Sequence, residues 1–366
     1  MKFNMSSTVE TIQAYEAGKP LKELERELGI VEAVKLASNE NPLGCSPATK
    51  EAVLNHLSQM HRYPESAAPE LTGMLAEKYG VSPGNVIVGN GSDDIICLLC
   101  HAFLNPGDEA LMPLPSFLMY EICVKIAKGN PIMVPLKGFD TDLEALIQGI
   151  GPKTRMVFIT NPFNPTGGTI SRSDFIEFSR RVPADVLIVV DEAYAEFVRD
   201  DSVYDSLERP LADDRIITLR TFSKAYGLAG FRVGYGIMDE GVAQILHRIR
   251  QPFNVNSLAQ VAACAALADG EFLAQSVQCA HDGLDQLVSG LRNMGLSCLP
   301  SQSNFLMVDV GRDSKKVFNA LLKEGVIARS MKSYGFKNYL RVNAGLPEEN
   351  QAFLAALKSV LEQDPA

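Results

Sequence analysis

A lysine stands at the point where a buried strand is expected to end, at residue 224 in the segment TFSKAYGLAGFRVGYG. The preceding RIITLRTF is dense in Ile, Leu and Phe, a pattern that predicts a buried strand. Arg232 follows eight residues later, among glycines. Desolvation and nearby cations lower the pKa of a lysine toward the range in which the amine is a nucleophile. Lys224 is therefore the candidate covalent anchor of a cofactor.

Further polar side chains follow other expected strands. In VLIVVDEAYAEF, Asp191 ends an apolar run, and a buried carboxylate needs a cation or hydrogen-bond donors. Tyr194 lies three residues on and can present its phenol to the same pocket. In MVFITNPFNPTGG, Asn164 lies in a loop stiffened by prolines. Each segment alone has a plain interpretation, a helix-starting aspartate or a tight turn.

The segment NVIVGNGSDDII reads as a strand, a glycine turn and the start of a helix. Gly91 allows the backbone to approach a ligand closely, and Ser92 is expected to cap the helix, whose first amides point outward. This arrangement favours an anion site, although an ordinary loop with a serine cap has the same pattern. The chain contains no GxxxxGK[ST] loop. Taken with Lys224 and Asp191, the pattern suits a planar phosphorylated pyridine that carries an aldehyde.

The elements that must position these groups form an alternating pattern of apolar runs and amphipathic stretches, which predicts an α/β fold with a mostly parallel sheet covered on both faces. Ligands of such sheets collect at the carboxyl ends of the strands. The pattern changes near residue 252. We expect an N-terminal arm at 1–40 that is part of the small domain, a large cofactor-binding domain at 41–252 and a small α+β domain at 253–366, joined by a helix. The expected strands of the large domain are 85–90, 109–114, 131–136, 155–160, 186–191, 215–220 and 232–237.

Composition limits the function classes. The 366 residues carry a formal net charge of −10, and this field disfavours nucleic acid and anionic membranes as partners. No run of 18 apolar residues predicts a membrane span, and the N-terminus lacks a signal-peptide pattern. Seven scattered cysteines favour a reducing cytoplasm. We expect Cys97 and Cys100 to pack in the core, and the five histidines have no metal-ligand spacing, so no metal site is predicted.

The order of NPFNPTGG, DEAYAEF and TFSKAYGLAGFRVGYG resembles the class I/II aminotransferases of pyridoxal 5′-phosphate (PLP) fold type I. Within them the chain is most similar to the histidinol-phosphate aminotransferases, through YEAGKP, VKLASNENPLG, HRYPE, GNGSDD, SNFLMV and YLRVNAG as well. The resemblance implies a seven-stranded, mostly parallel sheet between helices and a smaller α+β domain. It also implies a transferase of histidine biosynthesis, which converts L-histidinol phosphate and 2-oxoglutarate to imidazole-acetol phosphate and L-glutamate.

The resemblance implies roles in catalysis and cofactor binding. Lys224 matches the Schiff-base lysine that also moves the proton, Asp191 matches the partner of the pyridinium nitrogen, and Tyr194 contacts the 3′-oxygen together with Asn164. Phe117 stands at the ring-stacking position, where tyrosine is frequent. The residues that match the phosphate cradle are Gly91, Ser92, Asp93, Ser223 and Arg232.

The resemblance also implies a partner and a substrate pocket. Tyr63 matches the tyrosine that reaches the phosphate from the neighbouring subunit, which implies a homodimer with shared sites. The residues that match the substrate pocket are Tyr15, Asn39 and Arg341. Arg329 in VIARSM is a candidate for a second anion contact, and the alternative is a solvated arginine. An arginine suits either a carboxylate or a phosphate.

Three alternatives stay open. The first is an aminotransferase for aromatic amino acids, and the second is a threonine-phosphate decarboxylase on the same scaffold. The third is a PLP-binding regulator, which would add a DNA-binding domain; we expect no room for one ahead of residue 30, and the acidic charge disfavours it.

Overall fold

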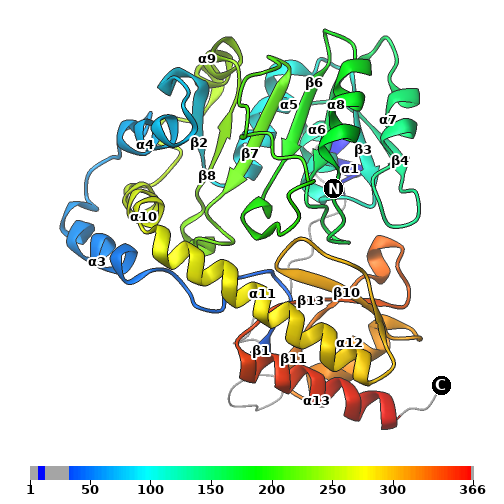
Figure 1. The fold of residues 1–366 in the computed structure, drawn as a ribbon. Helices are drawn as coiled ribbons and strands as arrows, with labels where there is room; N and C mark the ends of the chain where they lie inside the picture. The colour runs from blue at the N-terminus through cyan, green and yellow to red at the C-terminus, as the bar shows by residue number, and fades with distance from the viewer. Residues whose placement is uncertain (1–6, 13–32, 364–366) are drawn as a thin grey trace, which may run out of the picture.

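The computed structural model describes residues 7–12 and 33–363. Figure 1 shows two bodies, an upper one around a large twisted sheet and a smaller one below it. The candidate Tyr15 lies outside the described residues.

The larger body contains a seven-stranded sheet in the order β2-β8-β7-β6-β5-β3-β4. The seven runs predicted from the sequence are these strands. Neighbouring strands from β7 to β4 are parallel, whereas β8 is antiparallel to both of its neighbours. The sheet is therefore mostly parallel, as predicted. Its strands are β2 (Val86–Gly89), β3 (Glu109–Leu114), β4 (Asn130–Pro135), β5 (Thr154–Thr160), β6 (Leu187–Asp191), β7 (Ile216–Thr221) and β8 (Gly234–Ile237).

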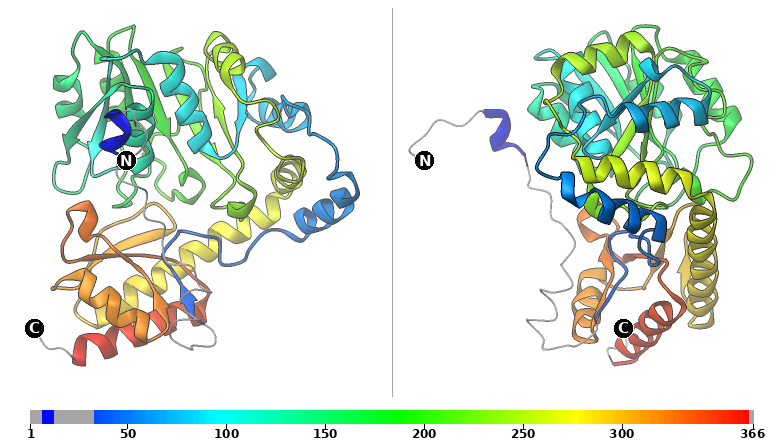
Figure 2. Two further views of the ribbon diagram at one scale, coloured as in Figure 1. Left: turned by 180° about the vertical axis from the view of Figure 1, so that it is seen from behind. Right: turned by 90° about the vertical axis from the view of Figure 1, so that its left-hand side faces the viewer.

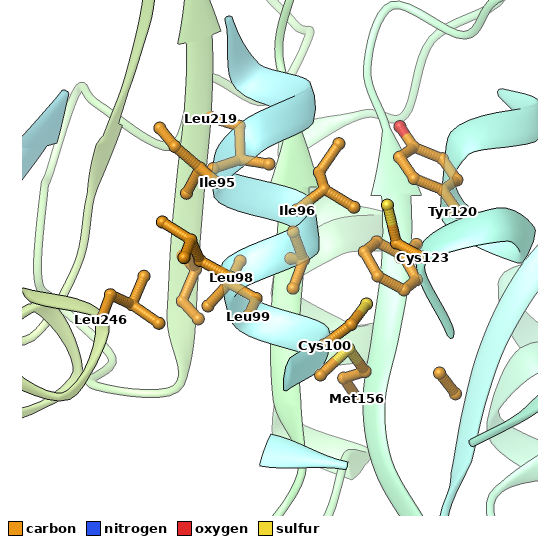
Figure 3. Packing of buried hydrophobic residues seen from close by; sticks show 14 of the residues in the cluster. Ile95, Ile96, Leu98, Leu99, Cys100, Tyr120, Cys123, Met156, Leu219 and Leu246 are labelled. Atoms are coloured by element: carbon orange, nitrogen blue, oxygen red, sulfur yellow. The ribbon is translucent and has the colours of Figure 1, made fainter. Parts of the chain in front are cut away.

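Helices cover both faces of this sheet, because side chains that alternate along each strand are apolar on both sides. On β6, Val189 packs into one core and Ile188 and Val190 into the other. The first core, shown in Figure 3, lies between the sheet and α5 (Ser92–Phe103), α6 (Leu118–Ile126) and α9 (Glu240–Ile249). The opposite face is covered by α4 (Pro69–Tyr79), α7 (Leu143–Gly149), α8 (Arg172–Arg181) and α10 (Ser257–Ala268).

The cysteine pair in DIICLLCHAF belongs to the first core. Cys100 is fully buried there, and Cys97 packs against the same cluster. The prediction that this CxxC is structural is therefore confirmed.

The smaller body is an antiparallel four-stranded sheet, β12-β13-β10-β9, covered by helices. A second, parallel pair joins β1 to β11, so residues 34–35 of the N-terminal arm lie in this body. Its strands are β1 (Val34–Lys35), β9 (Ser297–Cys298), β10 (Phe305–Asp309), β11 (Val326–Ile327), β12 (Arg329–Ser330) and β13 (Tyr339–Asn343), and its helices are α11 (Gly270–Asn293), α12 (Ser314–Lys323) and α13 (Pro347–Gln363).

The connection between the bodies is helical. The helix α10 lies against α3 and α4 of the larger body, and α11 then runs down beside the smaller one, as both views of Figure 2 show. We propose that the chain divides into an arm at 1–40, a large domain at 41–252 and a small domain at 253–366. In this division α10 belongs to the last part of the chain but packs on the larger body. The remaining short elements are α1 (Ser7–Glu10), α3 (Pro47–His56), η1 (Leu57–Gln59), η2 (Pro83–Asn85), η3 (Ala195–Phe197), η4 (Ala229–Phe231) and η5 (Lys332–Tyr334).

Within residues 7–12 and 33–363, no single helix has the length and apolar character needed to cross a membrane. The pair α10 and α11 passes that test only when the two are taken together, and the chain bends by 82° between them.

Candidate active site

A cavity of about 250 Å³ lies where the carboxyl ends of β5, β6 and β7 meet the smaller body. The fold brings these ends together because the three strands are parallel. Twelve of the predicted site residues line the cavity, although they are spread over three hundred positions of the chain. They are Asn39, Ser92, Asp93, Phe117, Asn164, Asp191, Tyr194, Ser223, Lys224, Arg232, Arg329 and Arg341.

Lys224 is partly buried and lines this cavity, three residues after the end of β7. Its Nζ donates a hydrogen bond to the carbonyl oxygen of Ser38 over 3.0 Å and lies 5.8 Å from the ring centre of Tyr194. Burial, together with the positive charge of Arg341, lowers the pKa of Lys224 to about 8. The amine therefore has a substantial uncharged fraction near neutral pH, which a nucleophile needs.

Asp191 ends β6 with its side chain buried at the same cavity. Its Oδ2 accepts a hydrogen bond from the Tyr120 hydroxyl over 2.6 Å, and its Oδ1 accepts one from the Ala193 amide over 3.2 Å. Burial raises the pKa of Asp191 to about 6, and the hydrogen bond from Tyr120 opposes this rise. The carboxylate can thus pair with a cation or a protonated ring nitrogen.

The start of α5 forms the anion cradle, with one difference from the prediction. The N-cap is Gly91, with φ +87°, and not Ser92, which is the first residue of the helix. A Cβ at Gly91 would lie 2.7 Å from the Arg232 guanidinium, so the backbone here lies close to the side chain that is predicted to bind the phosphate. The expected serine cap is wrong because only glycine adopts this backbone conformation without strain. The Ser92 side chain is left to line the cavity.

Arg232 supplies the positive charge of this cradle. Its guanidinium lies 3.4 Å from the Asp93 carboxylate and 3.4 Å from the Ser223 hydroxyl. Burial raises the pKa of Asp93, and Arg232 opposes the rise. Helix amides, a cation and two hydroxyl side chains therefore converge at one end of the cavity, which is the composition of a phosphate site.

Polar contacts connect the two bodies across the cavity. The Tyr194 hydroxyl accepts from Asn39 Nδ2 over 2.9 Å and from Asn164 Nδ2 over 3.5 Å. Arg341 donates to Asn164 Oδ1 over 2.6 Å and to the Ala37 carbonyl over 3.0 Å. Asn161, the other asparagine of NPFNP, instead bonds the backbone of Tyr204 and Ile170, as the plain loop interpretation predicts.

Arg329 and Arg341 are directly opposite each other on the antiparallel strands β12 and β13. Opposite residues on such strands project from the same face of the sheet. The two guanidinium groups therefore enter the cavity from the smaller body as neighbours. The smaller body therefore adds two cations to the lining of the cavity.

The structure does not place two of the predicted residues at this cavity. Tyr63 is 83% exposed, stacks on Phe253 at 4.6 Å between ring centres and borders a separate hollow. Tyr15 lies outside the described residues.

Sequence reasoning missed several groups at the cavity, among them the carbonyl of Ser38 and the side chains of Thr160, Thr221 and Tyr334. It also missed the hydroxyl of Tyr120, which does not line the cavity but bonds Asp191. No pattern in the apolar segment LMYEICVKI marks Tyr120 for a polar contact. No pattern marks a backbone carbonyl such as that of Ser38, since every residue has one.

The cavity fits the phosphorylated pyridine aldehyde that the sequence implies. An amine, a carboxylate and an anion cradle border one space, and Asn39 Oδ1 is a buried acceptor without a partner among the described residues. A buried polar atom of this kind needs a donor from a ligand. Within residues 7–12 and 33–363, no group of three or more His, Cys, Asp or Glu side chains could hold a metal ion.

Comparisons with known proteins agree with this site. Residues 31–357 match the family model "Aminotransferase class I and II". The chain is 46% identical to histidinol-phosphate aminotransferase 2 of Pseudomonas aeruginosa over 358 residues, which cover 97% of each chain.

Solved structures share the whole fold. Histidinol-phosphate aminotransferase of Sinorhizobium meliloti in complex with pyridoxal-5′-phosphate has a TM-score of 0.90 at 27% identity and covers 98% of both chains. A single mutant of Thermus thermophilus aspartate aminotransferase has a TM-score of 0.86 at 25% identity, over 98% of this chain and all of that one. With the family model spanning most of its length, this chain belongs to the class I and II aminotransferases.

Proposed function

We propose that the protein is a PLP-dependent aminotransferase that passes the amino group of L-histidinol phosphate to 2-oxoglutarate. The products are imidazole-acetol phosphate and L-glutamate, as in histidine biosynthesis. The observation that carries the proposal is the partly buried Lys224 that lines one cavity together with Asp191 and the residues predicted for an anion cradle. The substrate rests on the similarity to relatives named histidinol-phosphate aminotransferase.

The residues present account for each part of the cofactor. Lys224 would bond to the aldehyde, Asp191 would pair with the ring nitrogen, and Phe117 would stack on the ring. The 3′-oxygen would be held by Asn164 and Tyr194. The phosphate would bind Gly91, Ser92, Asp93, Ser223 and Arg232. When bound, PLP supplies an electron sink for the charge that develops at the substrate Cα.

Lys224 has the second task of moving a proton. Because its pKa lies near 8, its Nζ can take the proton from the substrate Cα at neutral pH and would deliver it to the adjoining carbon of the bound cofactor. Tyr194, whose ring centre lies 5.8 Å from this Nζ, and Asn39 are both buried, which limits the access of water from their side of the cavity.

Two arginines suit a phosphorylated amine. Arg341 and Arg329 provide paired guanidinium groups, and a phosphate accepts bidentate hydrogen bonds from each. Asn39 Oδ1 offers an acceptor to an N–H of the same substrate. We propose that Tyr15, through its match to the family pattern, completes the pocket.

The amine donor is tested by a single-turnover screen. The PLP-loaded protein is mixed separately with histidinol phosphate, phenylalanine, tyrosine and threonine phosphate, without 2-oxoglutarate. We expect one equivalent of keto product per site from histidinol phosphate at a rate well above that from the other donors. Faster turnover of phenylalanine or tyrosine would establish an aromatic aminotransferase instead. Release of carbon dioxide from threonine phosphate would establish the decarboxylase.

We propose a homodimer with shared sites, in which Tyr63 reaches the cofactor phosphate of the partner. Large apolar side chains that are exposed in the single chain support this proposal. Water-exposed apolar groups of this size are typical of interfaces. The exposed side chains that we assign to the interface are Leu43, Leu54, Leu57, Met60, Tyr63 and Phe253.

Replacing the exposed tyrosine tests the dimer. Tyr63→Glu places a charge on the proposed interface, and we expect sedimentation to show a shift toward monomer together with weaker cofactor binding. Leu211→Glu, at an apolar residue exposed elsewhere, is the control and should leave the mass unchanged. Monomeric wild-type protein that is fully active would contradict the shared site.

We propose a cytoplasmic location as well. Cys45, Cys97, Cys100, Cys123, Cys264, Cys279 and Cys298 are all free thiols. Free thiols suit a reducing compartment, which supports the location expected from the sequence.

A further inference from the structure

Tyr120 holds one oxygen of the carboxylate at the bottom of the cavity. Its hydroxyl donates to Asp191 Oδ2 over 2.6 Å and lies 2.9 Å from Thr160 Oγ1. Tyr120, Asp191 and Thr160 are all buried. A phenol has one proton, so when Tyr120 donates to Asp191 the hydroxyl of Thr160 must donate to Tyr120. The three side chains thus form a directed chain that ends on the carboxylate.

The phenol ring is fixed in place by its neighbours. It stacks on Phe158 of β5, with ring centres 4.6 Å apart and 9° between the planes. Its edge meets Phe117, at 5.6 Å and 86°. Figure 3 shows Tyr120 beside Cys123, with its hydroxyl at the end of the ring turned away from Met156. The core therefore leaves the hydroxyl aimed at Asp191, and the same packing connects it to the candidate ring-stacking residue.

The hydrogen bond acts on the charge of the carboxylate. Burial raises the pKa of Asp191, as does the negative charge of Asp93 at the start of α5. The bond from Tyr120, the Ala193 amide and the cation of Lys224 act in the opposite direction. Burial also raises the pKa of Tyr120, so the phenol stays a neutral donor. A hydrogen bond to an ionised acceptor favours the ionised form.

We propose that Tyr120 is a positioning residue that keeps Asp191 ionised and oriented toward the ring nitrogen of the cofactor. The role toward the cofactor rests on the proposed function, whereas the effect on the Asp191 carboxylate does not. The alternative is that Tyr120 only fills the core between α6 and β5. Because both roles involve the same ring, the test must remove the hydroxyl and keep the ring.

Tyr120→Phe makes that change. The matched control is Tyr235→Phe, which removes the hydroxyl of another fully buried tyrosine, one that bonds Tyr79 over 2.7 Å and does not contact Asp191. The full chain without added cofactor is labelled with carbon-13 at aspartate carboxyls, and Asp191→Asn assigns the Asp191 signal.

We expect the midpoint of Asp191 ionisation to rise by about one pH unit in Tyr120→Phe, a tenfold change in its protonation equilibrium. Tyr235→Phe should leave the midpoint at the wild-type value. An unchanged midpoint in Tyr120→Phe, with the protein folded as shown by circular dichroism, would overturn the proposal.

A second readout is the dissociation constant of PLP, measured by fluorescence. We expect Tyr120→Phe to weaken binding about tenfold in the wild-type background and to change nothing when Asp191→Asn is already present, since Tyr120 acts through that carboxylate. Equal weakening in both backgrounds would indicate a purely structural residue and overturn the proposal. If the wild-type protein binds no PLP, the proposed function fails, and the carboxyl titration alone still decides the role of Tyr120.

Discussion

At the residue scale, the site depends on ionisable groups moved away from their usual behaviour by burial. Lys224 is shifted toward the neutral amine and Asp191 toward the neutral acid, each by desolvation. Charges nearby then adjust the result. Arg341 pushes Lys224 further toward the amine, while Tyr120 returns Asp191 toward the anion. A nucleophilic amine and a carboxylate can in this way coexist in one small cavity.

The lowered pKa of Lys224 predicts the pH dependence of cofactor attachment. Only the uncharged amine attacks an aldehyde, so the rate of covalent attachment of PLP should rise with pH and level off above about 8. Arg341→Gln removes a cation that favours the amine, and the midpoint should move upward. Stopped-flow absorbance from pH 6 to 10 measures the rate of attachment in the wild type and in Arg341→Gln, and gives the midpoint of each pH profile.

Arg181→Gln is the control. Arg181 at the end of α8 forms an exposed ion pair with Glu144 of α7 and does not line the cavity. Its midpoint should equal that of the wild type. A rate that does not depend on pH across this range would contradict the account of Lys224.

At the element scale, strand ends and one helix start place the chemistry. The seven strands of the large sheet could be predicted closely from apolar runs, since a strand buried on both faces has no polar alternation to confuse with a loop. The start of α5 could not be predicted to the residue. A serine after a glycine favours a serine cap, but the backbone at Gly91 has φ +87° and takes the cap position itself.

The candidate site could likewise be predicted from the sequence only in part. Lys224, Asp191 and Asn164 stand next to recognisable strand ends or prolines and could be found. Tyr120 could not, because an apolar helix such as LMYEICVKI gives its tyrosine no mark of a polar contact. The Ser38 carbonyl was beyond prediction for a similar reason, as its contact with Lys224 depends on packing between two bodies.

The conformation of Gly91 predicts a specific effect on cofactor binding. In Gly91→Ala the Cβ meets Arg232 Nη2 at 2.7 Å in a backbone region that costs an alanine about 1–3 kcal/mol. We expect PLP affinity to fall about tenfold or more, as fluorescence titration would show.

The comparison variant is Gly73→Ala in the interior of α4, where a Cβ meets nothing within 4 Å. It should leave PLP affinity unchanged and raise stability by up to about 1 kcal/mol. Undiminished affinity in Gly91→Ala would mean that the start of α5 does not hold the phosphate.

At the scale of the whole molecule, a cluster of ion pairs connects β7 to the residue that follows β6. Arg220 is 2.8 Å from Glu192, 2.7 Å from Asp205 and 3.6 Å from Glu196. Burial raises the pKa of Glu192 to about 7, and the Arg220 charge opposes this. The single cation of Arg220 thus forms ion pairs with three carboxylates. One of them, Glu192, directly follows Asp191 in the chain.

Removing that cation should destabilise the fold. Arg220→Met leaves buried carboxylates without their partner, and we expect a loss of about 3–5 kcal/mol in the free energy of unfolding, measured in urea. Arg181→Met, which breaks an exposed pair, should cost under about 1 kcal/mol.

The loss should depend on pH with a definite sign. The folded pKa of Glu192 lies above its unfolded value of about 4.5, so the folded state binds more protons between about pH 4.5 and 7. Without Arg220 this pKa is higher still. Both proteins should lose stability in parallel through that window, and the stability of Arg220→Met should fall further relative to the wild type as pH rises above about 7, where only the variant keeps the proton. A difference that shrinks above about pH 7 would contradict the electrostatic account.

The central claim is that Lys224 is the covalent anchor of PLP. The most direct test is to mix the protein with PLP, reduce with borohydride and map the modified peptide by mass spectrometry, because reduction turns an amine–aldehyde bond into a stable secondary amine. We expect the label on Lys224 in the wild type and in Lys78→Ala, which removes another lysine whose pKa burial lowers, and none in Lys224→Ala. Label on a different lysine, or no stable label in the wild type, would contradict the account.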